Sequence, residues 1–105
     1  MNTKEYQQQI IRGSRLITEK IIELAKEANI DITKTKWDGD TLNLNVESYH
    51  TIEIFTEKNS IIEPFYPYEI AEFPSDSEGV IKSIRGMIKT LKNSEMDNEN
   101  NSLLS

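Results

Sequence analysis

The side chains that could perform chemistry are few in this sequence, and they are not spaced as a catalytic site. His50 is the only histidine among the 105 residues. As a general base it would need a partnered nucleophile, and the neighbouring residues supply none. Cysteine is absent, which excludes disulfides, thiolate nucleophiles and zinc–thiolate sites. We therefore expect His50 at a turn or a strand edge, and we expect no enzymatic activity.

A metal or nucleotide site is not expected either. Asp38-Gly39-Asp40 has the composition of part of a calcium loop, but such a loop needs further oxygen ligands at fixed spacing and a closing bidentate glutamate. Glu47 stands at the wrong distance for that role. The glycines at 13, 39 and 79 are isolated rather than in the order of a phosphate-binding loop. The sequence thus predicts a hairpin turn at Asp38-Gly39, and no metal or cofactor.

The charge is distributed unevenly along the chain. The net charge is −6, yet residues 37–79 hold ten acidic residues and a single lysine, Lys58, which is a net −9. Direct binding to a phosphate backbone needs clustered Lys and Arg, so the acidic middle argues against nucleic acid as the ligand. It favours a partner protein with a basic surface, because opposite charge speeds encounter and selects partners.

Two helices are expected at the ends of the chain. Ile10, Ile17, Ile21 and Leu24 recur at helical spacing within 3–28, with Asn2 and Glu5 as a capping pair and Asn29 as a left-handed cap. Gly13 inside this helix indicates a close approach or a bend. Ser75 and Glu78 predict a capping box for a second helix that ends near Lys92, with Lys89 and Lys92 complementing its dipole.

Strands are expected between the helices. Alternating apolar and polar residues predict strands at 33–37, 42–46 and 51–55, and a short fourth strand at 61–62 that stops before Pro64. Three prolines within 63–74 argue against both regular helix and interior strand there. Trp37, beside the predicted turn, is expected to pack beneath the first helix.

These elements predict an α+β fold in the order α-β-β-β-(β)-α. Short links between successive strands make a small sheet of three to four strands antiparallel, with the two helices packed on one face and the other face open. We expect one domain over 1–92 and a flexible polar tail over 93–105. No stretch approaches the about 20 apolar residues of a membrane span, and the N-terminus lacks a signal-peptide core, so a cytoplasmic protein is expected.

The acidic middle suggests a partner-binding surface with two parts. Glu47 and Glu53 fall on the polar phase of the strands, and Tyr66 and Tyr68 in the proline-rich segment are expected to be exposed, whereas Phe65 and Phe73 are expected in the core. An alternative interpretation is a solvated acidic surface that only keeps the protein soluble. The predicted partner-binding residues are Glu47, Glu53, Glu63, Tyr66, Tyr68, Glu69 and Glu72.

The function expected from these features is binding rather than catalysis. The first hypothesis is an inhibitor or regulator that engages a basic, nucleic-acid-binding surface of a partner protein, encoded by a phage or mobile element, with carboxylates standing where phosphates would bind. An immunity protein or antitoxin fits the same physics. A third hypothesis is a structural or assembly protein that forms a homodimer, either on a sheet edge or on the first helix, where Ile10, Ile17 and Leu24 stand seven apart.

Overall fold

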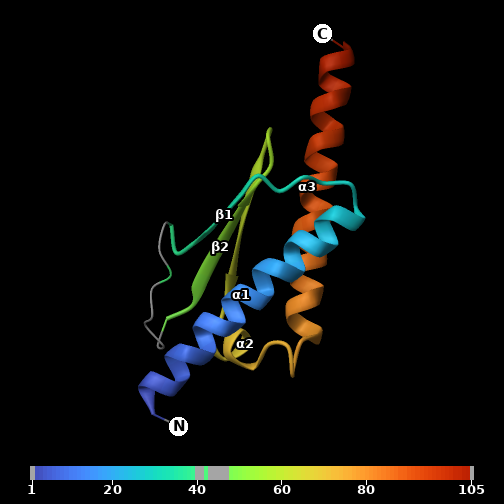
Figure 1. The fold of residues 1–105 in the computed structure, drawn as a ribbon. Coiled ribbons are helices and arrows are strands. Elements are labelled where there is room, and N and C mark those ends of the chain that lie inside the picture. The colour runs from blue at the N-terminus through green and yellow to red at the C-terminus, as the bar shows by residue number, and fades with distance from the viewer. Residues whose placement is uncertain (1, 40–41, 43–47, 105) are drawn as a thin grey trace.

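The computed structural model describes residues 2–39, 42 and 48–104, with side chains described as far as Glu95. Within these residues, three helices and a three-stranded antiparallel sheet form an α+β fold (Figure 1), which confirms the predicted fold class. β2 is the central strand between β1 and β3. The elements in chain order are α1 (Thr3–Glu27), β1 (Lys34–Trp37), β2 (His50–Phe55), β3 (Ser60–Phe65), α2 (Pro67–Glu72) and α3 (Glu78–Leu104).

The first helix begins and ends at the residues that its sequence indicates. Asn2 Oδ1 accepts a hydrogen bond from the Glu5 backbone N–H at 2.8 Å. At the other end Asn29 has a φ of 60°, and its N–H binds the Lys26 carbonyl while the Ile30 N–H binds that of Ala25. This pair of bonds is a Schellman motif, so both predicted caps are confirmed.

The hairpin expected at Asp38-Gly39 is described only as far as its turn. Both residues do take positive φ values, 51° and 91°. However, the strand that β1 pairs with in the described residues is β2, with Trp37 opposite Ile52. Residues 43–47 of the strand predicted at 42–46 lie outside the described part of the chain.

Pro64 does not end the last strand, which runs to Phe65. Pro64 stands opposite Thr51, and the backbone of Thr51 is already bound on its other side by Asp38. The Thr51 N–H donates to Asp38 Oδ1 at 3.0 Å, and the Thr51 carbonyl accepts from the Asp38 N–H at 2.8 Å. No ladder bond is therefore lost by the missing N–H of proline, and β3 is an edge strand, where proline is tolerated.

The proline-rich segment also contains a short helix, α2, so the expectation of no regular structure over 63–74 was wrong. Pro67 occupies its first position, where a backbone N–H has no helical partner in any case. The expected boundaries of the last helix were wrong as well. It begins at Glu78, directly after Ser77 rather than Ser75, and continues past Lys92 to Leu104. The flexibility predicted for 93–105 stays a prediction, since a helical backbone does not measure motion.

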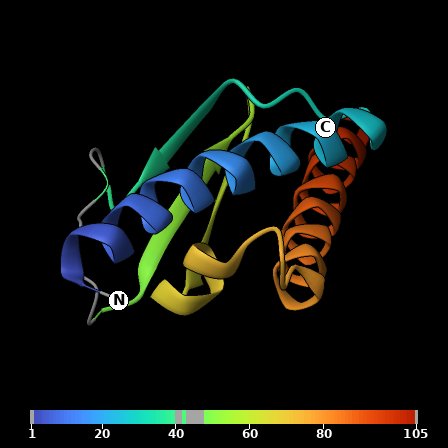
Figure 2. The ribbon, with the colours of Figure 1, turned by 60° about the horizontal axis from the view of Figure 1, so that its bottom comes forward.

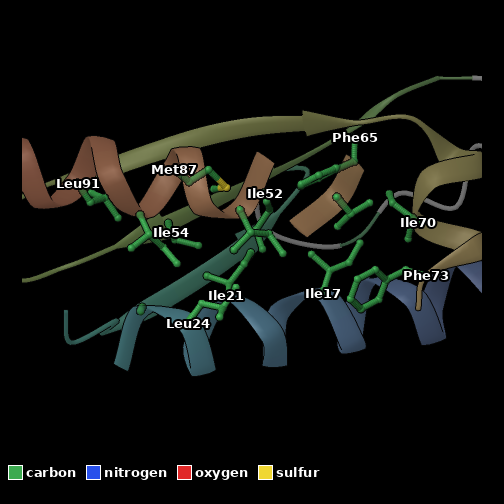
Figure 3. Packing of buried hydrophobic residues seen from close by; sticks show 14 of the residues in the cluster. Ile17, Ile21, Leu24, Ile52, Ile54, Phe65, Ile70, Phe73, Met87 and Leu91 are labelled. Atoms are coloured by element: carbon green, nitrogen blue, oxygen red, sulfur yellow. The ribbon is translucent and has the colours of Figure 1, made fainter. Parts of the chain in front are cut away.

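One core joins all three helices to one face of the sheet. Ile52 and Ile54 project from β2 into it (Figure 3), and each fully buried side chain of this size contributes about 1.5–3 kcal/mol. Trp37 lies beneath α1 as predicted, because its indole N–H donates to Thr18 Oγ1 at 2.9 Å. The labelled residues around them are Ile17, Ile21, Leu24, Phe65, Ile70, Phe73, Met87 and Leu91.

α1 crosses α2 (Figure 2), and its backbone comes very close to that of α2 at Gly13. A Cβ atom on Gly13 would overlap the carbonyl oxygen of Ile70 and lie 2.7 Å from its carbonyl carbon. α1 runs unbroken through this point. Of the two interpretations of Gly13, the structure therefore supports the close approach.

We predict that Gly13→Ala destabilises the fold even though alanine is the better helix former. The helix propensity gained is about 1 kcal/mol, but the methyl group meets backbone that cannot swing aside, and overpacking costs about 1–3 kcal/mol or more. The matched control is Gly86→Ala in α3, where a Cβ meets nothing within 4 Å, and which should gain up to about 1 kcal/mol. Urea denaturation measures both, and a stabilised Gly13→Ala would contradict the close contact.

Candidate protein-binding surface

Three exposed tyrosines gather where β2 begins and β3 ends. The side chains of Tyr49, Tyr66 and Tyr68 are 61%, 57% and 57% exposed. His50 pairs with Phe65, so the next step of the same register places Tyr49 beside Tyr66. Tyr49, Pro64, Phe65 and Tyr66 line a shallow pocket of about 170 Å³. We call Tyr49, Pro64, Tyr66 and Tyr68 the tyrosine patch.

Two of the three tyrosines, Tyr66 and Tyr68, are ordered by their neighbours. The rings of Tyr66 and Tyr68 stack with their centroids 5.8 Å apart and their planes 10° from parallel. The Tyr66 N–H donates to Glu69 Oε1 at 2.8 Å, which fixes the start of α2, and Pro67 restricts the backbone between the two rings. Phe65 is buried directly beneath. A surface ordered in this way loses little conformational entropy on binding.

Two carboxylates lie close to each other near the patch. Glu69 Oε1 accepts from the Tyr66 N–H, whereas Glu63 stands opposite the buried Ile52, on the face of β3 away from Pro64. Glu63, on β3, is half-buried, and burial raises the pKa of its carboxyl above the ordinary value, with the nearby Glu69 raising it further. In the part of the chain that the structure describes, neither residue takes part in an ion pair. Lys58 lies on the turn between β2 and β3, at the opposite end of both strands. The charge beside the tyrosines is therefore negative and only partly solvated.

The other predicted binding residues lie elsewhere. Glu72, at the end of α2, faces Tyr6 on α1. Burial of the Tyr6 hydroxyl raises its pKa above the ordinary value, and the nearby Glu72 carboxylate raises it further. Glu53 lies on the open face of the sheet, on the side away from the core. Glu47 is outside the described residues. The structure thus brings together Glu63, Tyr66, Tyr68 and Glu69. Glu53 lies apart from them on the open face of the sheet, whereas Glu72 shares α2 with Tyr68 and Glu69 and also faces Tyr6.

The open face of the sheet is not the uniformly acidic surface that the strand pattern suggested. Glu53 stands opposite Lys36 on β1. The ammonium groups of Lys34 and Lys36 lie 6.0 and 5.6 Å from the centre of the Phe55 ring, at cation–π distance. Ile62, on β3, is 55% exposed on the same face. In the described residues this face therefore mixes cations, one carboxylate and apolar side chains.

His50 is buried, which corrects the expectation of a turn or edge position. Its side chain is 2% exposed at the start of the central strand, and Nδ1 lies 2.9 Å from Asp38 Oδ2. Because a carboxylate only accepts, Nδ1 carries the proton. Nε2 is buried without a hydrogen-bond partner among the described atoms. An Asp–His pair of this kind orients the ring, but a substrate cannot reach Nε2 in this conformation.

The described residues contain no group of three or more His, Asp or Glu placed to hold a metal ion. Within the same residues, no helix has both the length and the apolar character needed to cross a membrane. No protein-family model, no curated protein and no solved structure matches this chain. The surface has therefore to be interpreted from its own chemistry.

Tyr49 and Pro64 are the members of the patch that the sequence analysis did not select. The signal was present, because strands that pair 51–55 with 60–64 about the turn at Glu57 and Lys58 would, if extended by two residues, bring Tyr49 opposite Tyr66. Ending the last strand before Pro64 removed that step of the register.

We predict that Glu63→Gln stabilises the protein at neutral pH. A carboxyl whose pKa is raised by folding binds protons more tightly in the folded state than in the unfolded state. At pH values above the folded-state pKa the group is charged, and this charge lowers the free energy of unfolding. The advantage of Gln over Glu should shrink as the pH falls through that pKa and vanish below about pH 4, where both states are protonated. Urea denaturation across this range measures it, with the exposed Glu57→Gln as control. An advantage that is constant with pH would contradict the prediction.

Proposed function

We propose that this chain is a protein-binding module whose contact surface is the tyrosine patch together with Glu63 and Glu69. The observation that carries the proposal is the group of three exposed tyrosines, two of them stacked on each other, near two carboxylates that no described cation neutralises. Tyrosine buries a large area at a low entropic cost and is enriched among the residues that dominate binding energy. Monomeric proteins seldom leave such residues clustered on the surface without a partner.

A basic partner surface fits this site best. The carboxylate of Glu63 already lies in a partly desolvated environment, so an approaching Lys or Arg would relieve an existing electrostatic cost. Cation–π contact with the exposed tyrosine faces would add to the attraction. The −9 charge of residues 37–79 supports the same preference at longer range.

The biological role that we propose is inhibition or regulation of a nucleic-acid-binding protein, with the carboxylates competing for the groups that bind phosphate. An origin in a phage or mobile element, and action in the cytoplasm, belong to this proposal. The role of an immunity protein or antitoxin would use the same surface. Catalysis is not proposed, because His50 is enclosed and bound to Asp38.

The homodimer built on the first helix is not supported. Ile10, Ile17 and Leu24 are 0%, 0% and 8% exposed because they fill the core of the same chain. A seam between two copies would require them on the surface.

We predict that Tyr66→Ser combined with Tyr68→Ser abolishes partner capture while the fold persists. Both side chains are more than half exposed, so the stability change should stay within about 1 kcal/mol. Tagged wild-type and variant proteins would be compared by capture from lysate at low and high salt, read by mass spectrometry. A basic protein that the wild type retains at low salt, and that is lost in the variant and at high salt, is the expected result.

The matched control replaces two exposed apolar residues on a different surface, Ile11→Ser with Ile22→Ser on α1. This control should capture the same protein as the wild type. Equal capture by all three proteins, or loss in the control alone, would show that the tyrosine patch is not the binding surface.

A further inference from the structure

α3 carries a row of cations that the core does not use. Lys82, Arg85, Lys89 and Lys92 follow one another at spacings of three and four residues, which places them along one side of the helix. Arg85 and Lys89 are exposed, and neither forms an ion pair in the described part of the chain. Because α3 continues to Leu104, Lys89 and Lys92 lie in mid-helix, and the helix dipole no longer explains them.

A groove runs beside this row, between α3 and the end of α1. Its volume is about 380 Å³. Leu24 and Ile88, both nearly buried, supply apolar lining, while Arg85 and Lys89 border it as exposed cations. Glu27, at the end of α1, is the one carboxylate among the described residues that line it, so cations still outnumber it. Lys92 also borders it and donates to the Ala28 carbonyl at 3.0 Å, which ties the two helices together. The groove therefore suits a segment that presents apolar and acidic residues together.

The distal part of α3 has that composition. Residues 94–104 contain Glu95, Asp97 and Glu99 and no Lys or Arg. If the alternating steps of three and four residues are continued beyond Lys92, they lead to positions 96, 99 and 103, which are Met, Glu and Leu. In Figure 1 this part of the helix extends beyond α1 and the β2–β3 hairpin. A single polar helix without tertiary packing is marginally stable in water.

We propose that two copies of this chain form a symmetric dimer through antiparallel α3 helices that cross near Lys92. In this arrangement the basic half of each α3 lies against the acidic half of the other, and position 99 of one copy comes opposite Arg85 of its partner. Position 96 comes to the groove beside Lys89. A two-fold axis makes the contact reciprocal and closed, so that no further copies add.

A second copy fits the row of cations better than nucleic acid does. The complementary charge belongs to the same helix, with positions 85 and 99 each seven residues from Lys92, while the Lys92 ammonium is bound to the Ala28 carbonyl of its own chain. The chain as a whole is at −6, which opposes approach to a polyanion. The dimer is also independent of the proposed function, because the tyrosine patch adjoins α2, at the end of the molecule away from the C-terminus (Figure 1).

Sedimentation velocity of the full chain at low salt tests the proposal, with the wild type expected at twice the 12.1 kDa chain mass. Arg85→Glu alone and Glu99→Arg alone should each weaken dimerisation about tenfold or more, because symmetry makes every substitution act at two places. Combining the two should restore the wild-type dimer. Raising the salt concentration should weaken the wild-type dimer through screening.

The control is Lys4→Glu, an exposed charge reversal on α1, which should leave the dimer intact. Circular dichroism of each variant establishes that it is folded. A wild type that is monomeric at every concentration would overturn the proposal. A dimer that neither Arg85→Glu nor Glu99→Arg weakens would also overturn it, as would a double variant that does not regain the wild-type dimer. These outcomes do not depend on what the tyrosine patch binds.

Discussion

The contact between Gly13 and the carbonyl of Ile70 is the constraint on which the other features depend. It lets α1 lie against the backbone of α2 rather than against side chains. α2 is only six residues long, too short to be stable alone, so its position follows from this contact and from the burial of Ile70 and Phe73. Tyr66 is the N-cap of α2 and Tyr68 lies in its first turn, so the core packing of this helix also positions the candidate surface.

Periodicity and capping predicted the parts of the fold in which local sequence and tertiary packing agree. α1 with both its caps, the α+β class, the burial of Phe65 and Phe73 and the exposure of Tyr66 and Tyr68 all belong to this group. The prolines misled because their effect depends on position. Pro64 faces a residue whose backbone is already bound to Asp38, and Pro67 starts a helix. Neither position can be recognised before the register of the sheet is known.

The arrangement of charges around the candidate site could likewise not be predicted before the pairing of the strands was known. Counting residues 37–79 as a block identified a real excess of carboxylates, but it ignored Lys34 and Lys36, which become neighbours of Glu53 only when β1 pairs with β2. The +1 net charge of 80–105 likewise conceals two halves of opposite sign within one helix. Charge along the sequence therefore predicted the sign of one surface, whereas the positions of the individual groups required the three-dimensional pairing.

The placement of Trp37 has a consequence for how this protein can be observed. It is the only tryptophan of the chain, and its indole connects β1 to Thr18 on α1 while its ring lies 6.4 Å from that of Phe65. Separation of α1 from the sheet would expose this ring to water and shift its fluorescence emission to longer wavelength. The tyrosine patch, by contrast, contains no tryptophan. The chain therefore carries a built-in optical reporter of its core that is separate from the surface proposed to bind a partner.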